Sequence, residues 1–287
     1  MASDNRIIVI TGPTASGKTG LAIELAERYK GEIICADSRT VYRGMDIGTA
    51  KPTPKEQARV KHHLLDVVDP DERFTAADFQ KLAREAITDI RSRGKVPFVV
   101  GGTGLYIDGL ILHYEFGQKS DDVTREKLEA RSVDELTAMI KEQHIPMPEN
   151  TQNKRHLVRA LEQSTINTNR LRVPESGTIV VAIATEKAQL IERISVRAKQ
   201  IFDGPIVEET KTLVAKYGWN HESMSGNVYP LVHGLLEGEL TLEQAIEQSI
   251  TKDRQLAKRQ ITWIKRHDYV KWLSLTEART YIKAVLE

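Results

Sequence analysis

Residues 6–19 read RIIVITGPTASGKT, and their pattern indicates the architecture of the chain. The β-branched run at 6–11 is typical of a buried strand, and residues 18–29 carry apolar side chains at helical spacing. Between them, residues 12–19 match G-x-x-x-x-G-K-[ST] in the strand–loop–helix context that this pattern needs. We therefore predict that the chain begins with a P-loop unit.

The rest of the chain continues the alternation of strands and helices. Short apolar runs predict strands at 32–36, 63–68, 96–100, 178–184 and, at an edge, 269–273. Periodic segments predict helices at 74–93, capped by Thr75, and at 187–201, 205–217, 242–266 and from 275 or 276 onward. This alternation predicts an α/β fold, a P-loop NTPase-like parallel sheet with helices on both faces.

The middle of the chain breaks this rhythm. Residues 115–150 are polar and mostly helical, with a helix predicted over 124–143. We predict a small helical lobe at 115–150, inserted into a core formed by residues 1–114 and 151–287.

Composition excludes several classes of protein. The 287 residues are 40% hydrophobic and 28% charged, which is ordinary globular composition. No apolar run approaches the roughly 20 residues of a membrane span, and residues 1–12 lack the signal-peptide pattern. The single cysteine, Cys35, excludes a disulfide framework and a Cys-based zinc site. We expect a cytoplasmic protein.

Charge is balanced overall but uneven along the chain. The net charge is +1, whereas residues 252–271 hold seven Lys or Arg against Asp253 and Asp268. Such a segment can follow a phosphate backbone or form a solvated helix face, and composition leaves both open.

The P-loop residues have distinct chemical uses. Gly12 and Gly17 let the backbone curl so that N–H groups point at phosphate oxygens, with the helix N-terminus behind them. Lys18 adds a full charge and Thr19 offers a hydroxyl to Mg²⁺. The loop therefore predicts binding of a diphosphate or triphosphate.

Two more side chains follow predicted strands at the sheet edge where ligands bind. Asp37 can take a proton, hold a metal or cap a turn with Ser38. Thr103, within GGTGLY at 101–106, can offer a hydroxyl to an anion in a turn whose glycines permit close backbone approach.

Several blocks together carry a resemblance to a known family. They are GPTASGKT, ADSRTVYRGMDIGTAKP, HHLLDVVDP, VVGGTGLY, a helix ending RALE, and QLAKRQITW. In this order, over residues 10–263, the chain resembles the tRNA dimethylallyltransferases, also called tRNA isopentenyltransferases. Eukaryotic members carry a C-terminal zinc finger, and with no Cys after Cys35 the chain is similar to the short bacterial form.

The resemblance implies transfer of a dimethylallyl group from dimethylallyl diphosphate to the N6 amine of the adenosine just 3′ of the anticodon, releasing diphosphate. It implies catalytic roles for Asp37 as general base, Thr103 and Lys18, with Mg²⁺ held at Thr19. The diphosphate-binding residues it implies are Gly12, Pro13, Thr14, Ala15, Ser16, Gly17, Lys18, Thr19, Arg193 and Arg197.

The resemblance also implies that tRNA is the second substrate, with the target base flipped out of its stack. The helical lobe would face the tRNA, and the enzyme would act as a monomer. The implied tRNA-binding residues are Asp37, Ser38, Arg39, Thr40, Arg155, His156, Arg159, Lys258 and Arg259. The chain departs from the family pattern at Thr40, where many members have Gln, at His156, where a basic residue is usual, and at Val228, where Gly is usual.

Other functions share parts of this pattern. An adenylate isopentenyltransferase shares the loop and the acid but acts on free nucleotide, and it needs neither the lobe nor the basic helix. A P-loop kinase would call for a second metal-binding acid motif, which the sequence does not clearly contain. A tRNA-binding module without activity would have no use for an intact loop and Asp37.

Overall fold

The computed structural model describes residues 6–116, 122–148, 150–163 and 171–287. The chain divides into two compact units, one made of Met1–Leu112 and Val173–Glu287 and the other of His113–Arg172. Within the described ranges, no helix combines the length and apolar character needed to cross a membrane.

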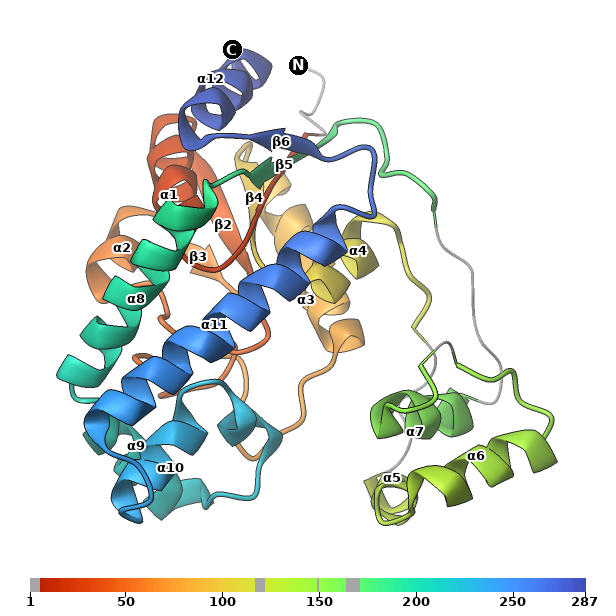
Figure 1. Ribbon diagram of the computed structural model, residues 1–287. Helices are drawn as coiled ribbons and strands as arrows, with labels where there is room; N and C mark the ends of the chain where they lie inside the picture. The colour runs from red at the N-terminus through yellow and green to blue at the C-terminus, as the bar shows by residue number, and fades with distance from the viewer. Residues whose placement is uncertain (1–5, 117–121, 149, 164–170) are drawn as a thin grey trace. The chain divides into compact units, whose positions relative to one another are not determined.

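The first unit is built on one six-stranded sheet with the strand order β3-β2-β4-β1-β5-β6 (Figure 1). Every neighbouring pair is parallel, which confirms the predicted α/β fold. The strands are β1 (Ile7–Thr11), β2 (Gly31–Ala36), β3 (His62–His63), β4 (Val96–Gly101), β5 (Thr178–Ile183) and β6 (Lys271–Leu273). Gly101 pairs with both Thr11 and Ala36, so β1, β2 and β4 end level with one another.

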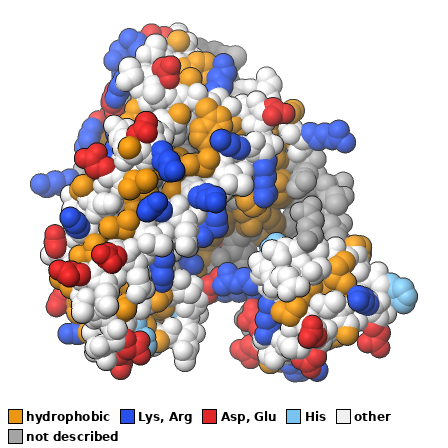
Figure 2. Space-filling view, viewed as in Figure 1, with side chains coloured by type: hydrophobic (Ala, Val, Ile, Leu, Met, Phe, Trp, Pro, Cys, Tyr) orange, Lys and Arg blue, Asp and Glu red, His pale blue; other side chains and the backbone are white. Residues whose placement is uncertain are grey.

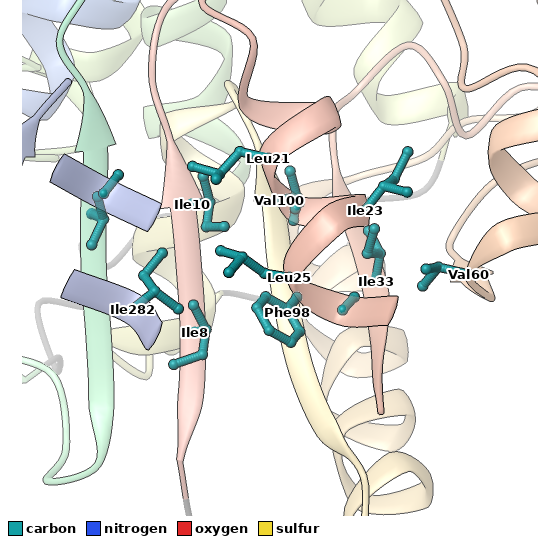
Figure 3. Packing of buried hydrophobic residues seen from close by; sticks show 14 of the residues in the cluster. Ile8, Ile10, Leu21, Ile23, Leu25, Ile33, Val60, Phe98, Val100 and Ile282 are labelled. Carbon is teal, nitrogen blue, oxygen red and sulfur yellow. The ribbon is translucent and has the colours of Figure 1, made fainter. Parts of the chain in front are cut away.

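Helices cover both faces of this sheet because its strands are apolar on both sides. On one face, α1 (Lys18–Arg28) and α12 (Leu275–Leu286) pack against alternate strand residues such as Ile8 and Phe98 (Figure 3). On the other, α3 (Ala76–Ser92) contacts β2 and β4. The predicted cap of α3 is confirmed, since the Thr75 side chain accepts a hydrogen bond from the Asp78 N–H.

The first unit contains further helices. They are α2 (Pro54–Arg59), α4 (Gly104–Ile111), α8 (Lys187–Asp203), α9 (Ile206–Tyr217), α10 (Tyr229–Leu236), α11 (Leu242–Ile264) and the 3₁₀ helix η1 (Glu222–Ser225). The longest of these, α11, packs against α8, α10 and α4.

Two predicted elements are wrong in extent. The strand expected at 63–68 is only His62–His63, because Leu64 and Asp66 adopt left-handed backbone angles (φ 64° and 53°) that a strand does not accept. The single helix expected at 124–143 is two, α5 (Asp122–Glu129) and α6 (Val133–Glu142). Ser132 accepts a hydrogen bond from the Glu135 N–H and so begins a new helix.

The second unit is a helical lobe of α5, α6 and α7 (Lys154–Gln163) around its own apolar core, which includes Leu136, Ile140 and Leu157. The lobe is therefore larger than the interval 115–150 predicted from sequence. Helix α7 lies in it because the apolar face of α7 packs on α6.

Candidate active site

The P-loop joins β1 to α1 at the edge of the sheet where β1, β2 and β4 end. Gly12 and Gly17 have φ angles of 146° and 90°, a region that side chains strain to enter. Gly17 is the residue before α1, and the first N–H groups of α1 have no acceptor within the helix. These donors and the helix dipole form a site for an anion.

Lys18 adds a charged group to this loop. Its Nζ donates a hydrogen bond to the Pro13 carbonyl at 3.3 Å. Desolvation lowers the pKa of Lys18 to about 8, while the nearby Asp37 carboxylate opposes this shift and the Arg197 guanidinium adds to it. The ammonium therefore lies near both side chains. A bound anion would stabilise its charged form further.

Asp37 follows β2 and caps a turn. Its Oδ1 accepts hydrogen bonds from the backbone N–H groups of Arg39, at 2.8 Å, and Thr40, at 3.4 Å. The capping interpretation of Asp37 is thus present in the structure, and it holds the carboxylate in one orientation. Because the cap engages one oxygen, it is compatible with proton transfer at the other.

Thr103 follows β4 and lies beside this turn. Its hydroxyl oxygen accepts a hydrogen bond from the Ser38 N–H at 3.1 Å, and its own N–H donates to the Ala36 carbonyl at 3.2 Å. Two segments that are distant in sequence therefore meet where β2 and β4 end.

These groups line one cavity of about 410 Å³, a size typical of a small-ligand site. The predicted site residues that line it are Thr14, Lys18, Thr19, Asp37, Ser38, Arg39, Thr40, Thr103, Arg197 and Arg259. Its walls also contain an apolar part formed by Ile33, Cys35 and Val100 on neighbouring strands. The cavity combines an anion site with an apolar recess.

The two predicted arginines of α8 occupy different places. Arg197 lines the cavity and pairs with Asp253 of α11 at 2.5 Å. Arg193 donates to the Ser16 carbonyl at 3.2 Å and lies in an adjoining groove with Lys18, Thr19 and Arg197. Both arginines therefore lie close to the P-loop, in the groove that Lys18 also lines.

Asp253 was not among the residues predicted from sequence. It is buried, with its second oxygen accepting a hydrogen bond from Asn227 at 2.8 Å, and it holds the Arg197 guanidinium at the cavity. The only signal was an acid within a basic helix, and that pattern is common on solvated surfaces.

Glu209 of α9 is a second residue that sequence reasoning missed. Its carboxylate accepts the N–H groups of Asp46, Ile47 and Gly48 at 2.7–3.0 Å and the Tyr229 hydroxyl at 2.9 Å. It thereby holds a turn and a ring that both line the cavity. No local pattern signals this contact, because Glu209 lies more than 160 residues from the turn.

The residues predicted to bind tRNA differ in their exposure and in their contacts. Arg39 donates to the carbonyls of Glu222, at 2.8 Å, and Ser223, at 3.3 Å, so its charge holds η1. Thr40 is buried. Lys258 and Arg259 are exposed on α11, and Figure 2 shows Lys and Arg side chains on the surface over this helix.

The other predicted tRNA contacts lie on α7 in the second unit. Arg155 and His156 are exposed, while Arg159 forms an ion pair with Glu162 at 3.5 Å. Arg155 and His156 are therefore open to solvent on that unit.

A Mg²⁺ ion at the loop would depend on Thr19 and on ligand oxygens. In the part of the chain that the structure describes, the one cluster of His and acid residues close enough to share a metal is Glu32, His63 and Asp89. Arg93 and Lys95 already donate to the Glu32 carboxylate, so that cluster is neutralised by protein cations. Beside a phosphate, Mg²⁺ takes few protein ligands. The Thr19 hydroxyl, which is half-buried at the cavity, is suited to be one of them.

The fold and cavity define an α/β P-loop protein whose cavity combines an anion site with an apolar wall. More narrowly, a family described as IPP transferase matches residues 40–267, and the chain belongs to this family.

Individual relatives are similar in sequence to this chain along nearly its full length. The chain is 38% identical to a tRNA dimethylallyltransferase of Anoxybacillus flavithermus, covering 98% of this chain and 94% of that one. It is 39% identical to a protein of the same name from Desulforudis audaxviator, covering 98% and 96%.

Solved structures show the same fold. The tRNA isopentenylpyrophosphate transferase of Bacillus halodurans matches with a TM-score of 0.74 and 35% identity, over 98% of this chain and 96% of that one. A eukaryotic dimethylallyltransferase described as acting on tRNA matches with a TM-score of 0.76 and 25% identity, over 98% and 77%.

Proposed function

We propose that this chain transfers a dimethylallyl group from dimethylallyl diphosphate to the N6 amine of the adenosine just 3′ of the anticodon in tRNA. The observation that carries this proposal is the meeting of Lys18, Asp37 and Thr103 at one cavity that also has an apolar recess. Family membership supports the same reaction.

The diphosphate would bind at the P-loop. Negative charge would develop on the diphosphate as the C–O bond breaks. The groups proposed to stabilise it are the N–H groups at the start of α1, the Lys18 ammonium and the guanidinium groups of Arg193 and Arg197. Preorganised donors of this kind stabilise the departing group without reorganising.

Mg²⁺ fits this site at Thr19, where it would neutralise part of the diphosphate charge. Thr19 is the protein ligand we propose for it, and diphosphate oxygens and water would supply the other ligands.

The dimethylallyl portion would lie against Ile33, Cys35 and Val100. Cys35 and Val100 are directly paired across β2 and β4, so their side chains share one face of the sheet. An apolar wall there excludes water from the allylic carbon, which would otherwise be hydrolysed.

Asp37 would act as the general base. An exocyclic aromatic amine is a weak nucleophile because its lone pair is delocalised into the ring. As N6 bonds to the allylic carbon and diphosphate leaves with the C–O electron pair, the N6 proton passes to Oδ2 of Asp37. Oδ1 keeps its bonds to the turn, so the carboxylate stays in place during this transfer.

The tRNA would contact cations on both units. Lys258 and Arg259 on α11, and Arg155 and His156 on α7, are exposed and suit phosphate contacts. The adenine would leave its stack to reach Asp37. We propose that Arg39 serves this site by positioning η1, since its guanidinium bonds the carbonyls there.

The test is incubation of the protein with radiolabelled dimethylallyl diphosphate, Mg²⁺, bulk tRNA and AMP together. We expect label in tRNA and none in AMP, with the modified nucleoside located by mass spectrometry in the anticodon loop. Label in AMP alone would make the chain an adenylate isopentenyltransferase, and label in neither would contradict the proposal.

A further inference from the structure

The side-chain amide of Gln260 joins two loops of the cavity. Its Oε1 accepts a hydrogen bond from the Thr14 N–H of the P-loop at 2.7 Å. Its Nε2 donates to the Gly102 carbonyl, beyond β4, at 3.1 Å. Gln260 thus reaches from α11 into the catalytic cavity, which it lines.

A side-chain amide is suited to both contacts. Thr14 presents a donor and Gly102 an acceptor, and an amide offers one of each. The fit is close, since a Cβ built on Gly102 would lie 2.2 Å from Gln260 Nε2. The amide therefore fills the space between residues 14 and 102.

This contact removes a donor from the P-loop. The Thr14 N–H points to Gln260, and the Ser16 N–H donates to the Pro13 carbonyl at 3.2 Å. The N–H groups of the first turn of α1, together with Lys18, remain for an anion. A third phosphoryl group would extend beyond this turn toward the first half of the loop. There the Thr14 N–H already donates to Gln260 and is not available to it.

Electrostatics acts in the same direction. Oε1 carries partial negative charge, and it lies against the first half of the loop. A longer polyphosphate brings more negative charge toward this oxygen, whereas a diphosphate held at the helix start keeps its charge at Lys18.

We propose that Gln260 is a specificity-determining residue that adapts the P-loop to a diphosphate and disfavours triphosphates. The proposal rests on the proposed function, in which the loop holds the diphosphate of the prenyl donor. In this proposal, a residue of α11 discriminates the diphosphate of the prenyl donor from nucleoside triphosphates.

The test uses inorganic pyrophosphate and tripolyphosphate as probes, with calorimetric affinities at one fixed Mg²⁺ concentration. For the unmodified protein we expect pyrophosphate to bind about tenfold more tightly, the contribution of one hydrogen bond to a charged group. Gln260→Ala frees the Thr14 donor and should bring the two affinities close together. Gln260→Glu keeps the acceptor but adds a charge, and it should widen the ratio.

Gln255→Ala is the matched control, because Gln255 is exposed on the same helix. Equal affinities for the two probes in the unmodified protein would overturn the proposal, and this measurement needs no variant. The proposal would also be overturned if the Gln260 variants changed the affinities for both probes by the same factor. A purely structural contact between the two loops would have that effect. Thermal melts confirm folding of each variant.

Both probes are inorganic anions, so this outcome is separate from tRNA prenylation. Selective pyrophosphate binding in a protein that prenylates nothing would contradict the proposed function and leave the role of Gln260 intact.

Discussion

The hydroxyl oxygen of Thr103 lies 3.1 Å from the backbone nitrogen of Ser38 and accepts its hydrogen bond. Ser38 directly follows Asp37, so this bond attaches the turn that holds the proposed base to the end of β4. The two residues are 65 positions apart in sequence. Thr103 therefore positions the Asp37 turn in addition to any contact it makes with diphosphate.

Thr103→Val should lower kcat by about 10²-fold, the effect of a displacement near 1 Å at a reacting group. Valine has a similar shape and no acceptor, so the Ser38 N–H loses its partner. Thr103→Ser keeps the hydroxyl and should stay close to the parent. Single-turnover prenylation of tRNA measures both. Equal activity of the Val and Ser variants would show that the hydroxyl has no part in the reaction.

Asp37→Asn should lower kcat by about 10²–10⁴-fold, the usual contribution of a positioned general base. Asparagine Oδ1 can still accept the Arg39 N–H, so the turn and the binding of both substrates should survive. The measurement is single-turnover prenylation at several Mg²⁺ concentrations, with thermal melts beside it. Rescue by raised Mg²⁺ would instead indicate a metal ligand, and a normal kcat would leave Asp37 with the turn cap alone.

Diphosphate affinity should depend on the ionisation of Lys18. Its pKa is lowered to about 8, chiefly by desolvation, so the ammonium is charged below that pH and increasingly neutral above it. The affinity of the parent for pyrophosphate, divided by that of Lys18→Met, should be largest below pH 8. The ratio should fall toward one as the pH rises further.

Taking this ratio cancels the titration of pyrophosphate itself. Calorimetry at a series of pH values provides the data. A ratio that stays constant up to about pH 10, where an ordinary lysine titrates, would contradict the lowered pKa.

Lys258→Ala combined with Arg259→Ala should weaken binding of all tRNAs alike. Contacts to phosphates carry little sequence information, and each one lost should reduce the log–log slope of affinity against salt by about 0.7–0.9. Filter binding at several salt concentrations measures the slope. Lys55→Ala with Lys61→Ala, a pair of exposed lysines elsewhere on the same unit, serves as the control. An unchanged slope in the α11 variant would place these cations outside the tRNA interface.

Much of the first unit follows from local sequence pattern. The P-loop, the apolar strands and the helix with its Thr75 cap are specified by residues close together in the chain, because backbone conformation and capping depend on neighbours. Asp37 and Thr103 could be placed at the sheet edge for a related reason, since parallel strands end together. Boundaries were less accurate where left-handed residues such as Leu64 end a strand early.

Contacts between distant segments needed the folded structure. Gln260 on Thr14, Asp253 on Arg197 and Glu209 on the turn at 46–48 each join parts of the chain separated by 56 residues or more. Such contacts depend on how α9 and α11 pack on the rest of the unit, and helical periodicity reports only which face is apolar. The location of α7 in the second unit has the same origin, because its apolar stripe could have packed on either unit and α6 covers it.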